Sequence, residues 1–151
     1  MAFITIKYTK KSQKIGLKID FGGFKRLIEF NVKNYRSIKD EMTLSMVASS
    51  SDKTSLPNNI IKGVLKNDNL LRSALIYGPN ASGKTNVILA LNFLKRLILN
   101  SANHLKGTGI RFEPFKLDES SKKKPTEMSV VFLKNKIKYI YEIFYIKERV
   151  I

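Results

Sequence analysis

The stretch Gly78-Pro79-Asn80-Ala81-Ser82-Gly83-Lys84-Thr85 matches the pattern G-x-x-x-x-G-K-[ST] in full. The run before it, Ser73-Ala74-Leu75-Ile76-Tyr77, is short and mostly apolar, which predicts a buried parallel strand. The residues after it, 84–101, contain no Gly or Pro and are rich in Leu, Ile and Ala, which predicts a helix. Strand, loop and helix therefore follow one another in the order that this pattern requires.

The residue types in this loop suit the binding of phosphate. Gly78 and Gly83 leave room for the backbone to wrap a phosphate, so that successive N–H groups point inward at the anionic oxygens. The helix that begins near Gly83 adds its positive dipole end. Lys84 is placed to reach the β- and γ-phosphates, and the Thr85 hydroxyl is the expected ligand of a Mg²⁺ that bridges them. The loop therefore predicts a nucleoside triphosphate site.

Composition limits the remaining choices. A chain of 151 residues is long enough for one ordinary domain. Its net charge of +16 raises the prospect of a nucleic-acid partner, although lysines dispersed through every segment also fit a protein from an AT-rich genome. The absence of cysteine excludes disulfides, thiolate metal sites and cysteine nucleophiles.

No stretch of the sequence is typical of a signal peptide or a membrane span. The most apolar stretch, residues 87–99, is interrupted by Asn92, Lys95 and Arg96 and is too short to cross a bilayer. We therefore expect a cytoplasmic protein with no membrane partner.

The first 26 residues allow two interpretations. Apolar residues alternate weakly over 4–8 and again over 15–21, which predicts a β-hairpin. Alternatively, these residues are an extension outside the native protein. The codons for Gly22-Gly23 can spell a ribosome-binding site, and Leu27 lies at a suitable distance to be a TTG start.

Further strands are predicted on both sides of the loop. Residues 27–37 alternate apolar and polar side chains, and residues 42–47 would pair with them in an antiparallel manner, followed by a loop over 49–59. Near the end of the sequence, residues 128–134 and 137–146 would form a hairpin around Asn135-Lys136, because Asn tolerates a positive φ.

The apolar and charged residues of the second half have simple structural interpretations. The helix is apolar on a wide surface, which indicates burial on more than one side. The aromatic residues Tyr139, Tyr141 and Tyr145 would share one face of a strand, where sheet packing is a better explanation than base stacking. His104 fits a loop or helix end, and residues 120–125 fit a solvated loop.

Three stretches of the sequence together resemble a known family. Residues 28–37, Ile-Glu-Phe-Asn-Val-Lys-Asn-Tyr-Arg-Ser, together with the loop and with Pro114-Phe115-Lys116-Leu117-Asp118, resemble the amino-terminal part of bacterial AAA-type ATPases with an ABC-like head. These are relatives of SMC-like ATPases and of the ATPase half of overcoming-lysogenization-defect nucleases.

The resemblance implies an α/β P-loop NTPase with mixed or antiparallel strands, plus the P-loop strand and helix. It implies that the loop binds ATP, that Arg36 and its neighbour Ser37 approach the phosphates from the first strand, and that Asn80 lies over the phosphate region. Such proteins commonly dimerise around ATP and act on DNA or in phage defence.

The sequence also departs from this family. After Thr85 no apolar run ends in Asp-Glu, so the acidic Walker B strand is missing, as are the signature loop and the switch residue. We therefore expect residues 27–151 to be a lobe truncated before Walker B, which binds nucleotide but has no catalytic residue of its own. The expected partners are a second copy, in a homodimer, or a separate carboxy-terminal half that carries the missing elements.

Other functions compete with this interpretation. A GTPase is disfavoured because Asp20-Phe21-Gly22-Gly23 precedes the loop instead of following it, and Asn135-Lys136-Ile137-Lys138 lacks the Asp that reads guanine. A small P-loop kinase would need a second acidic strand and an arginine-bearing lid. A DNA-binding or dimerisation module without activity, or an inactive gene fragment, remains the alternative.

Overall fold

A computed structural model describes residues 3–8, 26–49, 57–63, 69–100, 110–135 and 137–146. The elements in chain order are β1 (Phe3–Tyr8), β2 (Arg26–Lys33), β3 (Met42–Ser45), a 3₁₀ turn (Pro57–Asn59), β4 (Ile60–Ile61), β5 (Leu70–Leu71), α1 (Lys84–Asn100), α2 (Glu119–Lys122), β6 (Thr126–Lys134) and β7 (Ile137–Tyr145).

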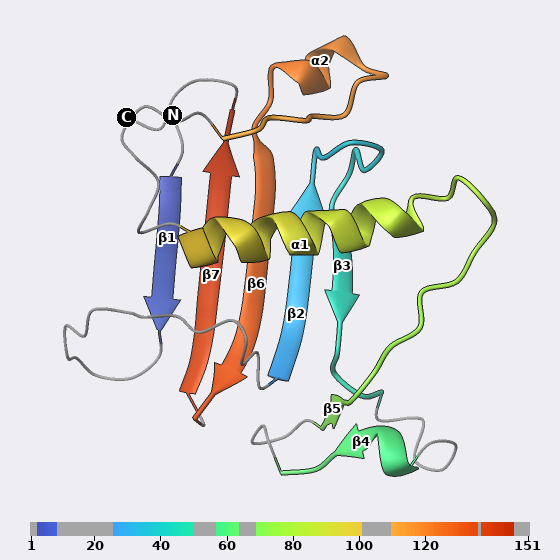
Figure 1. Ribbon diagram of the computed structural model, residues 1–151, viewed down its shortest axis with the longest axis vertical. Coiled ribbons are helices and arrows are strands. Elements are labelled where there is room, and N and C mark those ends of the chain that lie inside the picture. Colours follow the sequence, from blue (N-terminus) through green and yellow to red (C-terminus); the bar gives the residue numbers. More distant parts are fainter. Residues whose placement is uncertain are drawn as a thin grey trace.

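Five of the strands form one antiparallel sheet in the order β1-β7-β6-β2-β3 (Figure 1). The expected pair of β2 and β3 is confirmed, with Phe30 opposite Leu44. The expected hairpin of β6 and β7 is also confirmed, since Lys134 pairs with Ile137 and Asn135 has a φ of +52°. Asn tolerates this left-handed conformation better than most residues, which is why the turn forms without glycine.

One face of this sheet carries the core. The inward side chains of β2, β6 and β7 follow a period of two, as strand geometry requires. The buried apolar ones are Ile28, Phe30, Val32, Met128, Val130, Phe132, Tyr141, Ile143 and Tyr145, and Thr126 on β6 is buried as well. The aromatic stripe expected on the last strand is therefore sheet packing, with the partly buried Tyr139 stacked on Phe132 at 5.3 Å between ring centroids.

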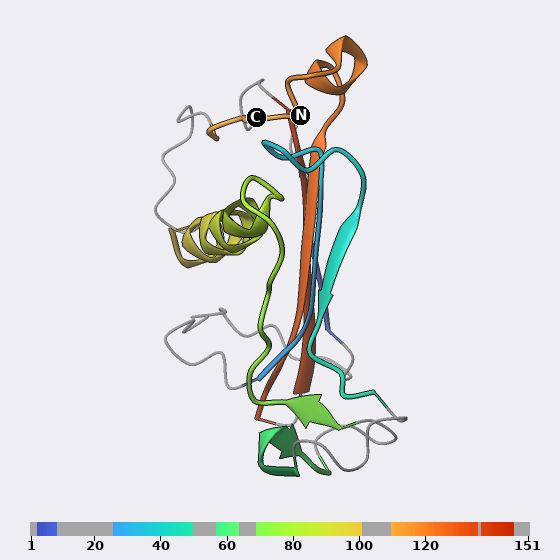
Figure 2. The same ribbon diagram turned by 90° about the vertical axis from the view of Figure 1, so that its right-hand side faces the viewer.

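Helix α1 crosses the strands and covers this face of the sheet (Figures 1 and 2). Its buried side chains against the core are Ala90, Leu94, Leu97 and Ile98. Ile88 and Leu99 are 47% and 41% exposed, so the part of the helix surface that carries them is not covered within the described residues. The prediction of a helix with a wide apolar surface is confirmed, but the described residues cover only one side of it.

Strand β3 leads to a small second sheet, which in turn leads to the glycine-rich loop. Leu71 N donates to Met46 O at 2.8 Å and Ala48 N donates to Asn69 O at 2.9 Å, so the chain after β3 pairs with β5. β5 then pairs with β4, and Asn59 holds Ser73 through its side-chain amide. The chain continues from there along the edge of the main sheet to the start of α1 (Figure 2).

The parallel strand expected over residues 73–77 does not form. This segment has no strand assignment, and Leu75 and Tyr77 are 85% and 87% exposed. A β-strand requires a neighbouring strand to accept and donate its backbone hydrogen bonds, and the described residues place none beside this segment. The segment is apolar in composition, but its Leu75 and Tyr77 side chains are not buried.

A second expectation is correct only in part, since Lys122, Lys123 and Lys124 are exposed as expected. Residues 120–125 do not form a simple solvated loop, because Glu119–Lys122 make one helical turn in which Ser121 is buried. Asp118 caps this turn by accepting a hydrogen bond from Ser120 N at 3.1 Å. Hydrogen bonds from Ser120 and Ser121 also hold the pKa of Asp118 far below its ordinary value.

Other expectations fall partly or wholly outside the described residues. β1 pairs with β7, with Phe3 opposite Phe144, whereas residues 15–21, expected as the second half of an amino-terminal hairpin, are not described. His104 and most of residues 49–59 also lie outside them. Among the helices that the structure describes, none is both long enough and apolar enough to cross a membrane.

Candidate functional site

The segment from Gly78 to Gly83 forms a loop around the side chain of Lys84. The ammonium group of Lys84 donates hydrogen bonds to Gly78 O at 2.9 Å and Pro79 O at 2.6 Å, and it lies 3.4 Å from Ser82 Oγ. Ser82 N closes a turn by donating to Pro79 O at 3.4 Å. The loop is therefore curled so that its carbonyl groups meet the cation of the residue that begins α1.

Gly83 is required by the geometry of this loop. Its φ is +90°, which L-residues with a side chain rarely adopt. A Cβ at this position would also lie 3.3 Å from Ser37 Oγ. Gly83 thus allows the chain to turn into α1 while the β2–β3 connection passes close by.

Gly78 and Ala81 also have positive φ values, of +156° and +63°. Ala81 pays a modest steric cost for its left-handed conformation, which is a feature of the loop that the sequence pattern does not reveal. Pro79, Asn80, Ala81 and Ser82 are all exposed, so this part of the loop is open to solvent.

The start of α1 offers further groups to an anion. Asn86 N donates to Gly83 O at 2.9 Å, so the helix is formed from its first turn. The first N–H groups of a helix have no partner within the helix, and its amino-terminal end carries partial positive charge. No acidic residue lies in the first turn of α1, and Thr85 is exposed there. The loop and helix end together therefore suit phosphate oxygens.

The structure brings Ser37 to this loop from a distant part of the sequence. Asn86 Nδ2 donates a hydrogen bond to Ser37 Oγ at 2.6 Å. Ser37 was expected near the loop, whereas the role of Asn86 as its partner was not foreseen. The contact shows that the β2–β3 connection and the start of α1 lie against each other.

Arg36 lies next to Ser37, but its guanidinium is held by Glu113. Arg36 Nε and Nη2 lie 3.1 Å and 2.9 Å from Glu113 Oε2, and Arg36 N donates to Glu113 O at 2.8 Å. The hydrogen bond from Arg36 to Glu113 raises the pKa of the guanidinium. Burial acts to raise the pKa of Glu113, but the bonds and charges of Arg36 and Arg111 outweigh it and hold that pKa below its ordinary value.

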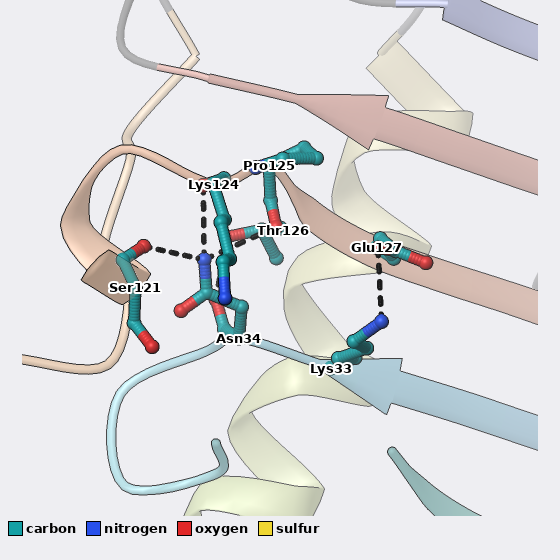
Figure 3. Close-up of polar contacts among 7 residues, drawn as sticks. All are labelled: Lys33, Asn34, Ser121, Lys124, Pro125, Thr126 and Glu127. Carbon is teal, nitrogen blue, oxygen red and sulfur yellow. Dashed lines mark hydrogen bonds and ion pairs between the residues drawn. The ribbon is translucent and has the colours of Figure 1, made fainter. Parts of the chain in front are cut away.

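Asn34 joins this region to the start of β6 (Figure 3). Its side chain is buried, and Nδ2 lies 2.8 Å from Ser121 O, 2.9 Å from Lys124 O and 3.1 Å from Pro125 O. Its Oδ1 accepts from Phe115 N at 3.0 Å, and its carbonyl accepts from Thr126 Oγ1 at 2.7 Å. Asn34 thereby fixes residues 115–126 against the end of β2.

Neither Asn34 nor Glu113 was singled out from the sequence. The signal for Asn34 was available, since an Asn that ends an alternating strand suits a left-handed position, and its φ is +53°. Glu113 lies 77 residues from Arg36, and nothing in the local sequence pairs them.

The described residues supply few protein ligands for a metal ion at this site. Among the described residues, no group of three or more His, Cys, Asp or Glu side chains lies together. A Mg²⁺ bound here would therefore depend on Thr85 and on oxygens of the phosphates themselves. The exposed Thr85 hydroxyl at the start of α1 fits that arrangement, because Mg²⁺ commonly keeps several waters and few protein ligands.

Comparison with known families gives one match. Residues 73–150, about half of the chain, match the family described as "AAA domain, putative AbiEii toxin, Type IV TA system". The match begins just before the loop and extends through α1, β6 and β7. No curated protein and no solved structure matches the chain.

Proposed function

Because the chain belongs to this family of AAA domains, and is thus a P-loop NTPase, we propose that it binds ATP with Mg²⁺ through residues 78–85. One observation carries the proposal: the loop curls around the Lys84 ammonium at the amino-terminal end of a formed helix. Loops of this kind bind phosphate through backbone N–H groups and the helix dipole.

Individual residues take distinct roles in this proposal. Lys84 exchanges its bonds to Gly78 O and Pro79 O for oxygens of the β- and γ-phosphates. The backbone N–H groups around Gly83 donate hydrogen bonds to the phosphate oxygens, and the Thr85 hydroxyl holds Mg²⁺. Ser37, in the β2–β3 connection, is held at the first turn of α1 by its hydrogen bond from Asn86, and Arg36 directly precedes it.

Hydrolysis needs groups that this sequence lacks. A carboxylate must hold Mg²⁺ and orient the attacking water, and no acidic strand follows the loop in these 151 residues. We therefore propose that the chain acts as the amino-terminal lobe of an ABC-like ATPase. A separate carboxy-terminal half would supply the acidic strand and pair with residues 74–77, whose Leu75 and Tyr77 are exposed.

The biological setting proposed here is phage defence or an action on DNA. The family description names a toxin of a type IV toxin–antitoxin system, which fits a defence role. The net charge of +16 favours a DNA partner, and binding to DNA should then weaken steeply with added salt. A DNA affinity that does not change with salt would refute that part of the proposal.

The test of nucleotide binding uses Lys84→Ala and a matched control. Fluorescent ATP and GTP analogues are titrated against the purified chain with Mg²⁺. Lys95→Ala removes the same side chain farther along α1, outside the loop. We expect selective ATP binding that is lost in Lys84→Ala and kept in Lys95→Ala. Equal binding by the two variants would refute the proposal.

A further inference from the structure

We propose that Glu113 is a positioning residue for nucleotide binding, whose carboxylate fixes the Arg36 guanidinium beside the phosphate loop so that it meets the terminal phosphate of a nucleoside triphosphate. This inference rests on the proposed function. It goes further because it assigns a role to a residue on the segment between α1 and α2, far in sequence from the loop and from Arg36.

Two side chains contact the guanidinium of Arg36, and a backbone hydrogen bond holds the residue that carries it. One edge, Nε and Nη2, meets Glu113 Oε2 at 3.1 Å and 2.9 Å. One face lies over the ring of the buried Tyr35, with Cζ 5.5 Å from the ring centroid. The Arg36 backbone is tied to Glu113 O at 2.8 Å. A guanidinium with one edge and one face occupied presents its other edge in a defined direction.

The Glu113 carboxylate does not fully neutralise the arginines that it contacts. Glu113 also accepts a hydrogen bond from Arg111 Nη2 at 3.0 Å, so two guanidinium groups share one carboxylate and the group of three keeps a net charge of +1. Arg has five N–H donors, of which two meet Glu113. The remaining donors suit the planar, bidentate recognition of phosphate.

The position of Arg36 relative to the loop follows from its neighbour. Ser37 receives the hydrogen bond of Asn86 in the first turn of α1 and lies beside Gly83. Arg36 and Ser37 together line a cavity of about 410 Å³, whose other lining residues are Glu113, Phe115, Lys116 and Leu117. Lys116 adds a second cation, so the charged side chains of this lining, Arg36, Glu113 and Lys116, carry a net charge of +1 beside the apolar side chains of Phe115 and Leu117.

The segment that carries Glu113 has a firm support. Asn34 Oδ1 accepts from Phe115 N at 3.0 Å, and the same buried amide holds the carbonyls at the start of β6. A carboxylate on an anchored segment can hold a guanidinium in one orientation. A carboxylate on a flexible loop would move together with the guanidinium and would not fix its orientation. The anchor makes Glu113 a support for Arg36.

The experiment compares affinities for MgATP and MgADP, because only the triphosphate has the terminal phosphate that Arg36 would meet. Arg36→Ala and Glu113→Ala should each weaken MgATP binding about tenfold, as expected for loss of one charge-assisted hydrogen bond, and leave MgADP binding nearly unchanged. The double variant should lose no more than either single variant. Glu113→Gln keeps an acceptor and the shape of the side chain, and should lose less than Glu113→Ala.

Matched controls separate this role from general stability. Glu127→Ala removes a carboxylate that pairs with Lys33 at 3.3 Å on the exposed sheet surface, and should change neither affinity. Tighter MgATP binding by Glu113→Gln would overturn the inference, because Glu113 would then compete with phosphate for Arg36. Equal losses for ATP and ADP would overturn it in favour of a structural role.

The outcome for Lys84 keeps the two proposals apart. If Lys84→Ala loses binding while Arg36→Ala keeps the wild-type preference for ATP over ADP, the role of Glu113 fails and the proposed function stands. If Lys84→Ala binds as the wild type does, the proposed function fails, and the role of Glu113 fails with it.

Discussion

Replacing Asn34 with alanine should be one of the most destabilising single changes at the end of β2. The amide has two N–H hydrogens for three carbonyl oxygens, so one hydrogen is shared, and Oδ1 accepts a further bond from Phe115 N. Counting three full hydrogen bonds at about 1 kcal/mol each gives about 3 kcal/mol. Alanine at a φ of +53° adds about 1 kcal/mol of backbone strain, so the free energy of unfolding should fall by about 4 kcal/mol.

The measurement is urea unfolding of the wild type and variants at equilibrium. Asn34→Gly removes the same hydrogen bonds but tolerates positive φ, so it should be about 1 kcal/mol more stable than Asn34→Ala. Asn31→Ala is the matched control on the same strand. Asn31 also takes part in three side-chain hydrogen bonds, with Glu29, Ser129 and Thr43, but it is only half-buried.

Burial should decide the difference between these two asparagines. Water can replace the partners of a half-exposed amide, whereas the buried carbonyls around Asn34 would be left without partners. Asn31→Ala should therefore cost less than about 1 kcal/mol. Equal losses for Asn31→Ala and Asn34→Ala, or a loss below about 1 kcal/mol for Asn34→Ala, would refute the reasoning.

Three further predictions test the loop and the core. Gly83→Ala should weaken MgATP binding about tenfold, because its φ of +90° and the nearby Ser37 Oγ both oppose a Cβ; unchanged affinity would contradict this. Tyr141→Phe should raise the free energy of unfolding by about 1 kcal/mol, because this buried hydroxyl has no hydrogen-bond partner among the described residues. Burial raises the pKa of Tyr141 from 10.0 to about 12, so the wild type should lose stability as pH rises from 10 to 12, and the variant should show less of this loss. Leu94→Ala should cost about 3 kcal/mol in thermal or urea unfolding, and Leu99→Ala, at a site 41% exposed, much less; similar costs would mean that α1 does not pack as described.

Local patterns in the sequence predicted most of the secondary structure that the described residues contain. Alternation placed β2, β3, β6 and β7, since a strand with one buried face repeats every two residues. The helix after the loop was predicted from a run without Gly or Pro, and α1 spans Lys84–Asn100. The turn at Asn135 followed from the tolerance of Asn for positive φ.

The sequence patterns gave wrong predictions where the local structure depended on a residue or strand that is close in space but distant in sequence. An apolar run such as residues 73–77 predicts burial, but burial and strand pairing need another strand beside it. The short helix at α2 depends on the Asp118 cap and on contacts to Asn34, which lies 87 residues from Ser121. The secondary-structure propensity of a few consecutive residues gives no information about partners that are distant in the sequence.

For the candidate site, the sequence by itself determined the phosphate loop, because its chemistry lies within eight consecutive residues and a helix that follows directly. The tertiary structure alone decided which other residues lie near the phosphate loop. Ser37 reaches the first turn of α1, Arg36 is held by Glu113, and Asn34 anchors the segment that carries Glu113. These contacts join residues about 50 to 90 positions apart, and only the folded sheet and its connections bring them within hydrogen-bond distance.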